Sequence, residues 1–280
     1  MSELKVNSIK GVGASTAAIT VNNSDGTCTA NITNNLSNRN LIINGAMQVA
    51  QRGTSSTSNH YATVDRFRIV HNGDDEAPTQ AQVDVASGTT PYTLGFRKAL
   101  RITNGNQTSG AGSNDVISIT QRVEAQNMAT SGWNYVSSSS YVTLSFWVKS
   151  SVAQNFYIRL TTSDGTQKSY PMETGSLTAD TWTKFTKAIP GHADLQFDLN
   201  ADTGLNVDFS IFRGTDQTAS GVTLDQWSTN DQAAKIPDMT STWYTTNDAT
   251  FEITGVQLEV GSVATDFEHK SYAQELQLCK

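Results

Sequence analysis

The chain has 280 residues, 16% of them charged, and a formal net charge of −7 from 26 acidic and 19 basic side chains. That length fits one large domain or two modest ones. Lys and Arg form no basic stripe, which leaves nucleic-acid binding with little electrostatic support and disfavours an anionic membrane surface. The sequence has no apolar run near the ~20 residues that a membrane-inserted helix needs.

Ser and Thr make up 66 of the 280 residues. Thr is β-branched and favours strands, while Ser competes with helix hydrogen bonds, so we expect an all-β fold. The two cysteines, Cys28 and Cys279, offer no disulfide framework. The opening MSELKVNSIK has no hydrophobic signal core, so we expect no secretion. A bacterial cytoplasm, or a particle assembled there, fits these features.

Residues 1–39 alternate short apolar and polar positions, which predicts strands, and contain no aromatic side chain. Segments below ~40 residues rarely bury enough surface to fold alone. The segment is therefore either a flexible tail or an anchor that orders on other copies or on a larger assembly, and the alternation favours the anchor. The candidate anchor and oligomerisation residues are Leu4, Val6, Ile9, Ile19, Val21 and Ile32.

Residues 40–269 carry short strand patterns with turn signals at roughly 10-residue spacing, which is typical of a sandwich or barrel. The predicted strands are 41–43, 64–70, 96–103, 116–123, 141–149, 156–161, 182–189, 195–199, 207–211 and 250–260. The clearest is Tyr141–Lys149, in which Val142, Leu144, Phe146 and Val148 share the predicted core face.

The last strand changes its alternation phase at Gly255, where a β-bulge would return both halves to one core face. Residues 270–280 then begin with a capping box at Ser271 and Gln274, which predicts a short helix. Barely two turns long, that helix would be unstable alone and must dock on something.

The stretch NLIINGAMQVAQRGTS followed by VDRF resembles a pattern of bacteriophage tail-fibre and related virion proteins, N-G-x-F-x-x-W-Q-R-G-T-S before an A-D-R-W-like strand. Aromatic positions of that pattern are replaced here at Met47 and Ala50, and its Trp by Phe67. The opening MSELKVNSI and the closing ITGVQLEVGSVATDFEHKSYAQELQLCK also resemble phage structural proteins, the former those of marine phages. The closing segment lacks the R-Y-Y-like run into which those proteins usually continue. The matching residues are Asn44, Gly45, Gln51, Arg52, Gly53, Thr54, Ser55, Asp65 and Arg66.

The middle of the chain, YVTLSFWVKSS through TADTWTKFTKAIP, resembles the jelly-roll of carbohydrate-binding modules. This resemblance implies a two-sheet jelly-roll sandwich, often with glycan affinity and sometimes with a structural calcium ion. Fold alone does not grant that function, because the same scaffold also serves assembly.

Aromatic side chains among turn residues could stack on sugars beside polar partners. They could equally plug the ends of the sandwich or pack at trimer contacts. The candidate glycan-binding residues are Trp133, Tyr135, Trp227, Asn230, Trp243 and Tyr244.

A weak metal candidate is Asp198, Asn200 and Asp202, whose oxygens stand at positions one, three and five of a calcium-loop pattern. Thr203 and Phe209 replace the Gly and Glu that the pattern requires at positions six and twelve. The same residues also fit the solvent face of a strand, so we expect no cofactor, with structural calcium as the alternative.

The four histidines are scattered, and no motif of nucleophilic or metal catalysis occurs. Dispersed carboxylates could still converge as in a glycoside hydrolase. The sequence favours a non-enzymatic virion protein, most simply a homotrimeric tail fibre or appendage that contacts other virion proteins and displays the sandwich to host surface polysaccharide. The alternatives are a capsid decoration or tail-assembly protein with protein contacts alone, and a glycan-binding module or polysaccharide depolymerase.

Overall fold

The computed structural model describes residues 6–13, 17–21, 28–30 and 39–280. The chain forms two compact units, Met1–Ser37 and Asn38–Lys280. The first contains a three-stranded antiparallel sheet of β1 (Ser8–Ile9), β2 (Ile19–Val21) and β3 (Cys28–Ala30). Of the candidate anchor residues in it, Val6 and Ile9 are 39% and 53% exposed, and Leu4 and Ile32 lie outside the described residues.

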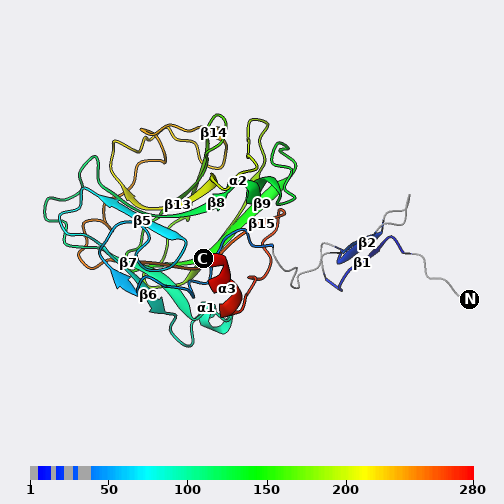
Figure 1. Cartoon of the computed structure of the whole chain (residues 1–280), viewed down its shortest axis with the longest axis horizontal. Coiled ribbons are helices and arrows are strands. Elements are labelled where there is room, and N and C mark those ends of the chain that lie inside the picture. The colour runs from blue at the N-terminus through cyan, green and yellow to red at the C-terminus, as the bar shows by residue number, and fades with distance from the viewer. Residues whose placement is uncertain (1–5, 14–16, 22–27, 31–38) are drawn as a thin grey trace, which may run out of the picture. The chain divides into compact units, whose positions relative to one another are not determined.

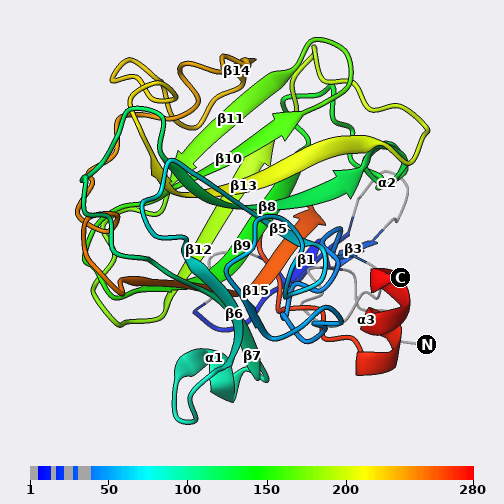
Figure 2. The same cartoon turned by 60° about the vertical axis from the view of Figure 1, so that its left-hand side comes forward.

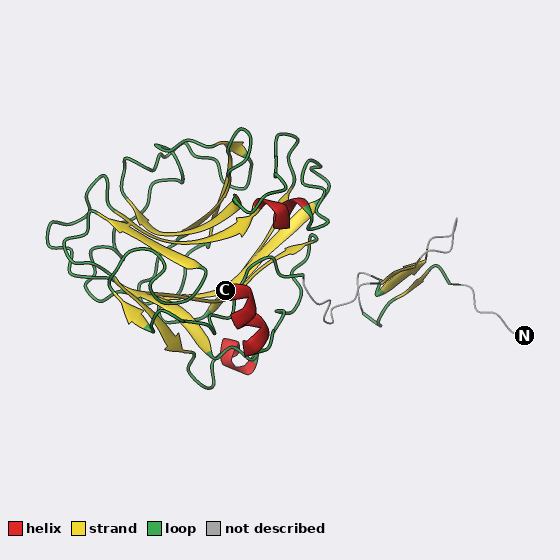
Figure 3. Ribbon diagram, viewed as in Figure 1, coloured by secondary structure: helices red, strands yellow, loops and turns green. Residues whose placement is uncertain are grey.

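The second unit is a jelly-roll sandwich of two six-stranded antiparallel sheets, which confirms the predicted all-β class (Figures 2 and 3). The sheet that we call the groove sheet has the order β14-β11-β10-β13-β8-β5. Its strands are β5 (Phe67–Asn72), β8 (Val116–Glu124), β10 (Tyr157–Thr162), β11 (Lys168–Glu173), β13 (Thr203–Arg213) and β14 (Ser228–Thr229).

The other sheet, which we call the covered sheet, has the order β12-β9-β15-β7-β6-β4. Its strands are β4 (Ser55–Ser56), β6 (Thr79–Asp84), β7 (Lys98–Thr103), β9 (Tyr141–Ser150), β12 (Thr183–Pro190) and β15 (Thr250–Val260). Three short helices complete the unit: α1 (Thr90–Thr93), α2 (Ala125–Ala129) and α3 (Tyr272–Cys279). None of the described helices is long and apolar enough to cross a membrane.

The main core lies between the sheets and follows the predicted alternation. The four core-face residues of β9 are each at most 1% exposed, and the Phe146 ring meets Phe209 of the groove sheet edge to face at 5.0 Å. Each such buried side chain stabilises the fold by about 1.5–3 kcal/mol.

The β-bulge predicted in β15 is confirmed. The register against β9 shifts between Thr254 and Gln257, and Gly255 has a φ of 64°. An added Cβ at Gly255 would lie 2.6 Å from the Phe96 ring, so both the conformation and the space require glycine. Phe251 and Leu258 consequently share the core although their alternation phases differ.

The capping box of α3 is also confirmed, with Ser271 and Gln274 bonding reciprocally. The helix docks on its own chain: the Glu275 carboxylate accepts a hydrogen bond from the Asn44 backbone N–H, and Arg66 donates to the Leu278 carbonyl at 2.6 Å. This docking gives the short helix its partner without a second copy.

The residues of the phage-like pattern form one network around Asn44 and Asp65. The Asn44 amide donates to the carbonyls of Val49 and Asp65, both at 2.9 Å, and its oxygen accepts from the Val49 N–H at 3.0 Å. Gln51 donates to the Asp65 carboxylate, and Arg52 lies 3.4 Å from it. These polar side chains therefore fix the turn.

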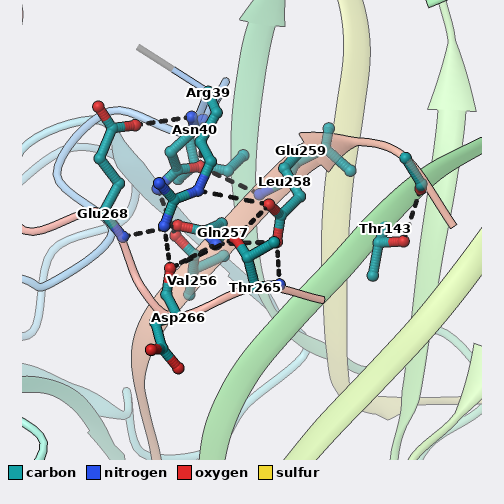
Figure 4. Close-up of polar contacts among 12 residues, drawn as sticks. Arg39, Asn40, Thr143, Val256, Gln257, Leu258, Glu259, Thr265, Asp266 and Glu268 are labelled. Carbon is teal, nitrogen blue, oxygen red and sulfur yellow. Dashed lines mark hydrogen bonds and ion pairs between the residues drawn. The ribbon is translucent and has the colours of Figure 1, made fainter. Parts of the chain in front are cut away.

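A second network, shown in Figure 4, closes the sandwich where residues 39 and 40 meet β15. The buried Glu259 carboxylate accepts from Thr265 at 2.6 and 2.9 Å and pairs with Arg39 at 3.4 Å. The Asn40 backbone N–H donates to Glu268 at 2.8 Å, and its side chain accepts from the Leu258 N–H at 3.0 Å.

Two predicted strands are wrong. Residues 41–43 lead into a turn, in which the Asn40 side chain takes the Ile42 N–H that a strand partner would take. Residues 195–199 form a loop that buries Leu195 and Phe197 but leaves Leu199 78% exposed. Strands β6 and β11 are not predicted from the sequence, because their polar side chains hide the alternation.

Candidate ligand-binding groove

The outer face of the groove sheet is polar because, along most of each strand, apolar side chains alternate with polar ones that point away from the core. In β13, Val207 and Phe209 enter the core, and Asn206 and Asp208 therefore point to the opposite face. The antiparallel register places Arg159 of β10 directly beside Asp208. Polar side chains of β5, β8 and β10 continue this face, among them Arg68, Ser118, Thr120, Arg122 and Thr161.

Irregular pairing at the end of β13 adds a further cation. The register against β8 shifts between Ser210 and Phe212, so Ile211 and Phe212 are both buried in the core. Arg213 consequently reaches the outer face, where it donates to the Asp208 carboxylate at 2.9 and 3.0 Å and to the Ser210 hydroxyl at 2.8 Å. Strict alternation would have sent Arg213 inward.

The segment after β13 builds the walls of a groove on this face. Figure 1 shows this yellow-to-orange segment standing beyond the groove sheet around β14. Asn230 accepts from Arg159 at 3.0 Å and donates to the Gln167 side chain at 3.1 Å, and Lys235 donates to Gln217 at 2.7 Å. The groove holds about 430 Å³, within the range of ~300–1,000 Å³ common for small-ligand sites.

Burial and neighbouring charges shift the pKa values of three side chains in the groove. Burial raises the pKa of Asp208, but Arg213, Arg159 and the Ser210 hydrogen bond outweigh it, so the net pKa is lowered and the carboxylate stays ionised. Burial lowers the pKa of Arg159 to about 10, which still leaves it protonated at neutral pH. Burial, with repulsion from Arg213 and Arg159, lowers the pKa of Lys235 to about 8.

A smaller pocket of about 210 Å³ lies on the outer face of the covered sheet. Its lining includes Phe96, Trp147, Phe267 and His269. These rings pack on one another, with Phe96 5.0 Å from Phe267 and 5.1 Å from His269 between centroids. This pocket lies in a small second hydrophobic cluster that caps the sheet.

Most of the aromatic glycan candidates lie in the core. Trp133 is 3% exposed, and Trp243 and Tyr244 are 0% exposed, so these rings present no free face for stacking on a sugar. Tyr135 is half-buried and packs edge to face on Phe197 at 5.0 Å. These four residues lie away from the groove lining.

The other two candidates lie on or near β14. Trp227 donates its indole N–H to the Pro190 carbonyl at 2.7 Å and packs on Tyr170 at 5.2 Å. Asn230 is the one sequence candidate that lines the groove. Of the six residues chosen from the sequence, the structure thus brings Asn230 to the site.

The calcium candidates bond locally. Asp198 accepts from the Gln196 side chain at 3.0 Å, and the Asn200 oxygen accepts from the Asp202 N–H at 3.0 Å. No group of three or more His, Cys, Asp or Glu side chains suited to a metal ion occurs among the described residues. The expectation of no cofactor, with calcium at this loop as its alternative, stays a prediction.

Comparison with known proteins gives fold likenesses alone. No family model matches the chain. No curated protein matches it either. Among solved structures, the enzymatically active domain of bacteriophage CBA120 tailspike protein 4 is 12% identical with a TM-score of 0.41, over 79% of this chain and 21% of that one.

Two further similar structures are a carbohydrate-binding module and a component of a phage baseplate. A CBM4 carbohydrate-binding module is 15% identical with a TM-score of 0.39, over 79% of this chain and 99% of that one. The tripod from the baseplate of bacteriophage Tuc2009 is 14% identical with a TM-score of 0.35, over 91% of this chain and 66% of that one. Phage tail and baseplate proteins and carbohydrate-binding modules are thus among the structural neighbours.

Proposed function

We propose that the chain is a bacteriophage virion protein, a tail fibre or similar appendage, whose sandwich attaches to a saccharide of the host surface through the groove. The observation that carries the binding role is the open groove itself, lined by Asn206, Asn230, Gln167 and several cations. Amide and guanidinium groups are the donors and acceptors that sugar hydroxyls require. The phage-like pattern around Asn44 and Asp65 supports the virion setting.

Binding without hydrolysis accounts best for the groove chemistry. Glycoside hydrolysis uses two carboxyl groups that flank the scissile bond. Within the described residues, Asp208 is the sole carboxylate of the groove lining, and one terminal nitrogen of Arg213 donates to both of its oxygens. An ionised, buried carboxylate with these partners is a poor proton donor.

The N-terminal unit would anchor the sandwich to the particle or to other copies. Its described strands have two or three residues each, and Val6, Ile9 and Val12 are exposed. Sheets this small need further packing for stability. We expect the full chain to be trimeric, and light scattering that finds a monomer at micromolar concentration would contradict this part.

The binding role can be tested on an array of bacterial surface polysaccharides. N230A removes a groove side chain, and N247A, on an exposed residue of the Trp243 loop, is the matched control. We expect wild type and N247A to bind the same saccharides and N230A to lose about tenfold in affinity. A blank array would favour the assembly alternative, and equal loss in both variants would contradict the assignment to the groove.

A further inference from the structure

The groove has an excess of positive charge in a chain whose net charge is −7. Its lining includes five cations, and Asp208 is the one carboxylate among the described lining residues. The cations are Arg68, Arg122, Arg159, Arg213 and Lys235.

The Asp208 carboxylate already accepts hydrogen bonds from Arg213 and from two neighbouring hydroxyl groups. Arg213 contacts both of its oxygens, Ser210 donates to it at 2.7 Å, and Thr120 donates to it at 3.3 Å. The carboxylate therefore balances one cation and leaves four.

Arg159 is 8% exposed and has a neutral partner. One of its terminal nitrogens donates to the Asn230 oxygen at 3.0 Å, and its buried Nε has no hydrogen-bond partner. Among the described residues, no carboxylate lies within 4.0 Å of its guanidinium. A buried donor without an acceptor costs stability, and a ligand oxygen would remove that cost.

Lys235 and Arg213 share a neutral acceptor. Both donate to the Gln217 side-chain oxygen at 2.7 Å, which brings two cations to one uncharged atom. Burial and the two neighbouring guanidiniums disfavour the charged form of Lys235 and lower its pKa to about 8. An anion placed between these groups would reverse that repulsion.

We propose that the groove selects an anionic saccharide and places its carboxylate, sulfate or phosphate group against Arg159, Arg213 and Lys235. The inference rests on the proposed saccharide-binding function and narrows its ligand class. Asn206, Asn230 and Gln167 remain for the neutral hydroxyls of the same chain. The described groove lining has no aromatic ring, so it lacks the stacking platform that single-stranded nucleic acid uses.

Calorimetric titration of the full chain with matched saccharide pairs tests the proposal. The pairs are polygalacturonate against its methyl ester, dextran sulfate against dextran, and phosphomannan against mannan, which separate carboxylate, sulfate and phosphate sources. We expect at least one acidic member to bind about tenfold or more tightly than its neutral partner at low salt, with the preference falling as salt rises. A thymidine oligonucleotide serves as the nucleic-acid probe.

The charge variants locate the effect. K235Q and R122Q each remove one groove cation, and K184Q removes an exposed cation of the covered sheet as the matched control. We expect K235Q to lose about tenfold toward the acidic saccharide, R122Q to lose less, and K184Q to bind as wild type.

Four results would overturn the proposal. If acidic and neutral partners bind equally, the charge preference is wrong while saccharide binding stands. If no saccharide binds, the proposed function fails as well. If K184Q loses as much as K235Q, or the oligonucleotide binds as tightly as the best saccharide, the groove does not select an anionic sugar.

Discussion

The outer faces of the two sheets differ in how their charged side chains are paired. On the covered sheet, buried carboxylates have their own cations: Glu252 contacts Arg101 at 2.8 Å and Lys149 at 3.1 Å, and Glu259 contacts Arg39 at 3.4 Å. On the groove sheet, cations outnumber the single carboxylate of the described groove lining. Internal pairing serves folding, whereas we propose that the unbalanced charge of the groove serves ligand binding.

The two outer faces also differ in their apolar side chains, which are more numerous on the covered sheet. Phe96, Trp147 and Phe267 close the covered sheet with a second hydrophobic cluster. The described groove lining has Val70 and Val116 as its apolar members and no ring. Substitutions on the covered face should therefore cost stability, and those in the groove, Asp208 excepted, should cost binding.

Removing the groove carboxylate should give the largest effect on stability. D208A leaves Arg213 buried without its counter-charge, so we expect the free energy of unfolding to fall by about 3–5 kcal/mol. D84A, in an exposed pair with Lys98, should cost below about 1 kcal/mol. Urea denaturation measures both, and equal losses would contradict the buried-pair account.

The same carboxylate predicts an acid dependence. Its pKa is lower in the folded chain than the ordinary 3.8, because the guanidiniums and the Ser210 bond outweigh burial. Its stabilisation of the fold is therefore fully present above this ordinary value and is lost as pH falls through the folded pKa. D208N should show a flatter stability profile between pH 5 and pH 2 than wild type.

The bulge of the covered sheet predicts the next largest effect. G255A must place a Cβ 2.6 Å from the Phe96 ring at a φ of 64°, so we expect a loss of about 2–4 kcal/mol. Gly221 has no heavy atom within 4 Å of an added Cβ, and G221A is the control, with little change. Saccharide binding by folded G255A should match wild type.

Trp227 distinguishes a structural from a ligand-binding indole. W227F removes the bond to the Pro190 carbonyl and should lower the free energy of unfolding by about 0.5–1.5 kcal/mol, with saccharide affinity retained. Denaturation and calorimetry on the same preparation give both values. Lost affinity with unchanged stability would return Trp227 to the binding site.

Replacing Lys235 should give the smallest change in the free energy of unfolding, and this change should be an increase. Because its pKa is lowered from 10.5 to about 8, the folded chain binds fewer protons than the unfolded chain between these values. The free energy of unfolding of the wild type should therefore increase as pH rises from about 8 to 10.5. K235M should be more stable than wild type at pH 7 by about 0.5–1 kcal/mol, after allowance for solvent screening, and the gap should close toward pH 10.5. K184M should show no such window.

Local patterns predicted much of the fold and little of the groove. The alternation of β9, the bulge at Gly255 and the capping box at Ser271 are local signals, and all three are confirmed. Arg159 and Asp208 lie about 50 positions apart in sequence, and only the register of β10 on β13 joins them. Arg213 needed the irregular pairing at Ser210, which the sequence does not mark.

Turn-rich surroundings predict that an aromatic side chain lies in a loop, but they do not decide whether its ring is buried. Trp243 lies in such a loop, but its ring is buried. Its backbone N–H donates to the Gln154 side chain at 2.9 Å, and its indole N–H donates to the Thr250 carbonyl at 3.0 Å. Asn230, a polar residue of the same loop as Trp227, is the predicted residue that lines the groove.

Hydrogen–deuterium exchange of the full chain, with and without a bound host polysaccharide, tests most directly which face binds. The account predicts slower exchange in β10, β13 and residues 214–236, and unchanged exchange around Phe96 and Phe267. Protection confined to the covered sheet, with none in the groove, would contradict it.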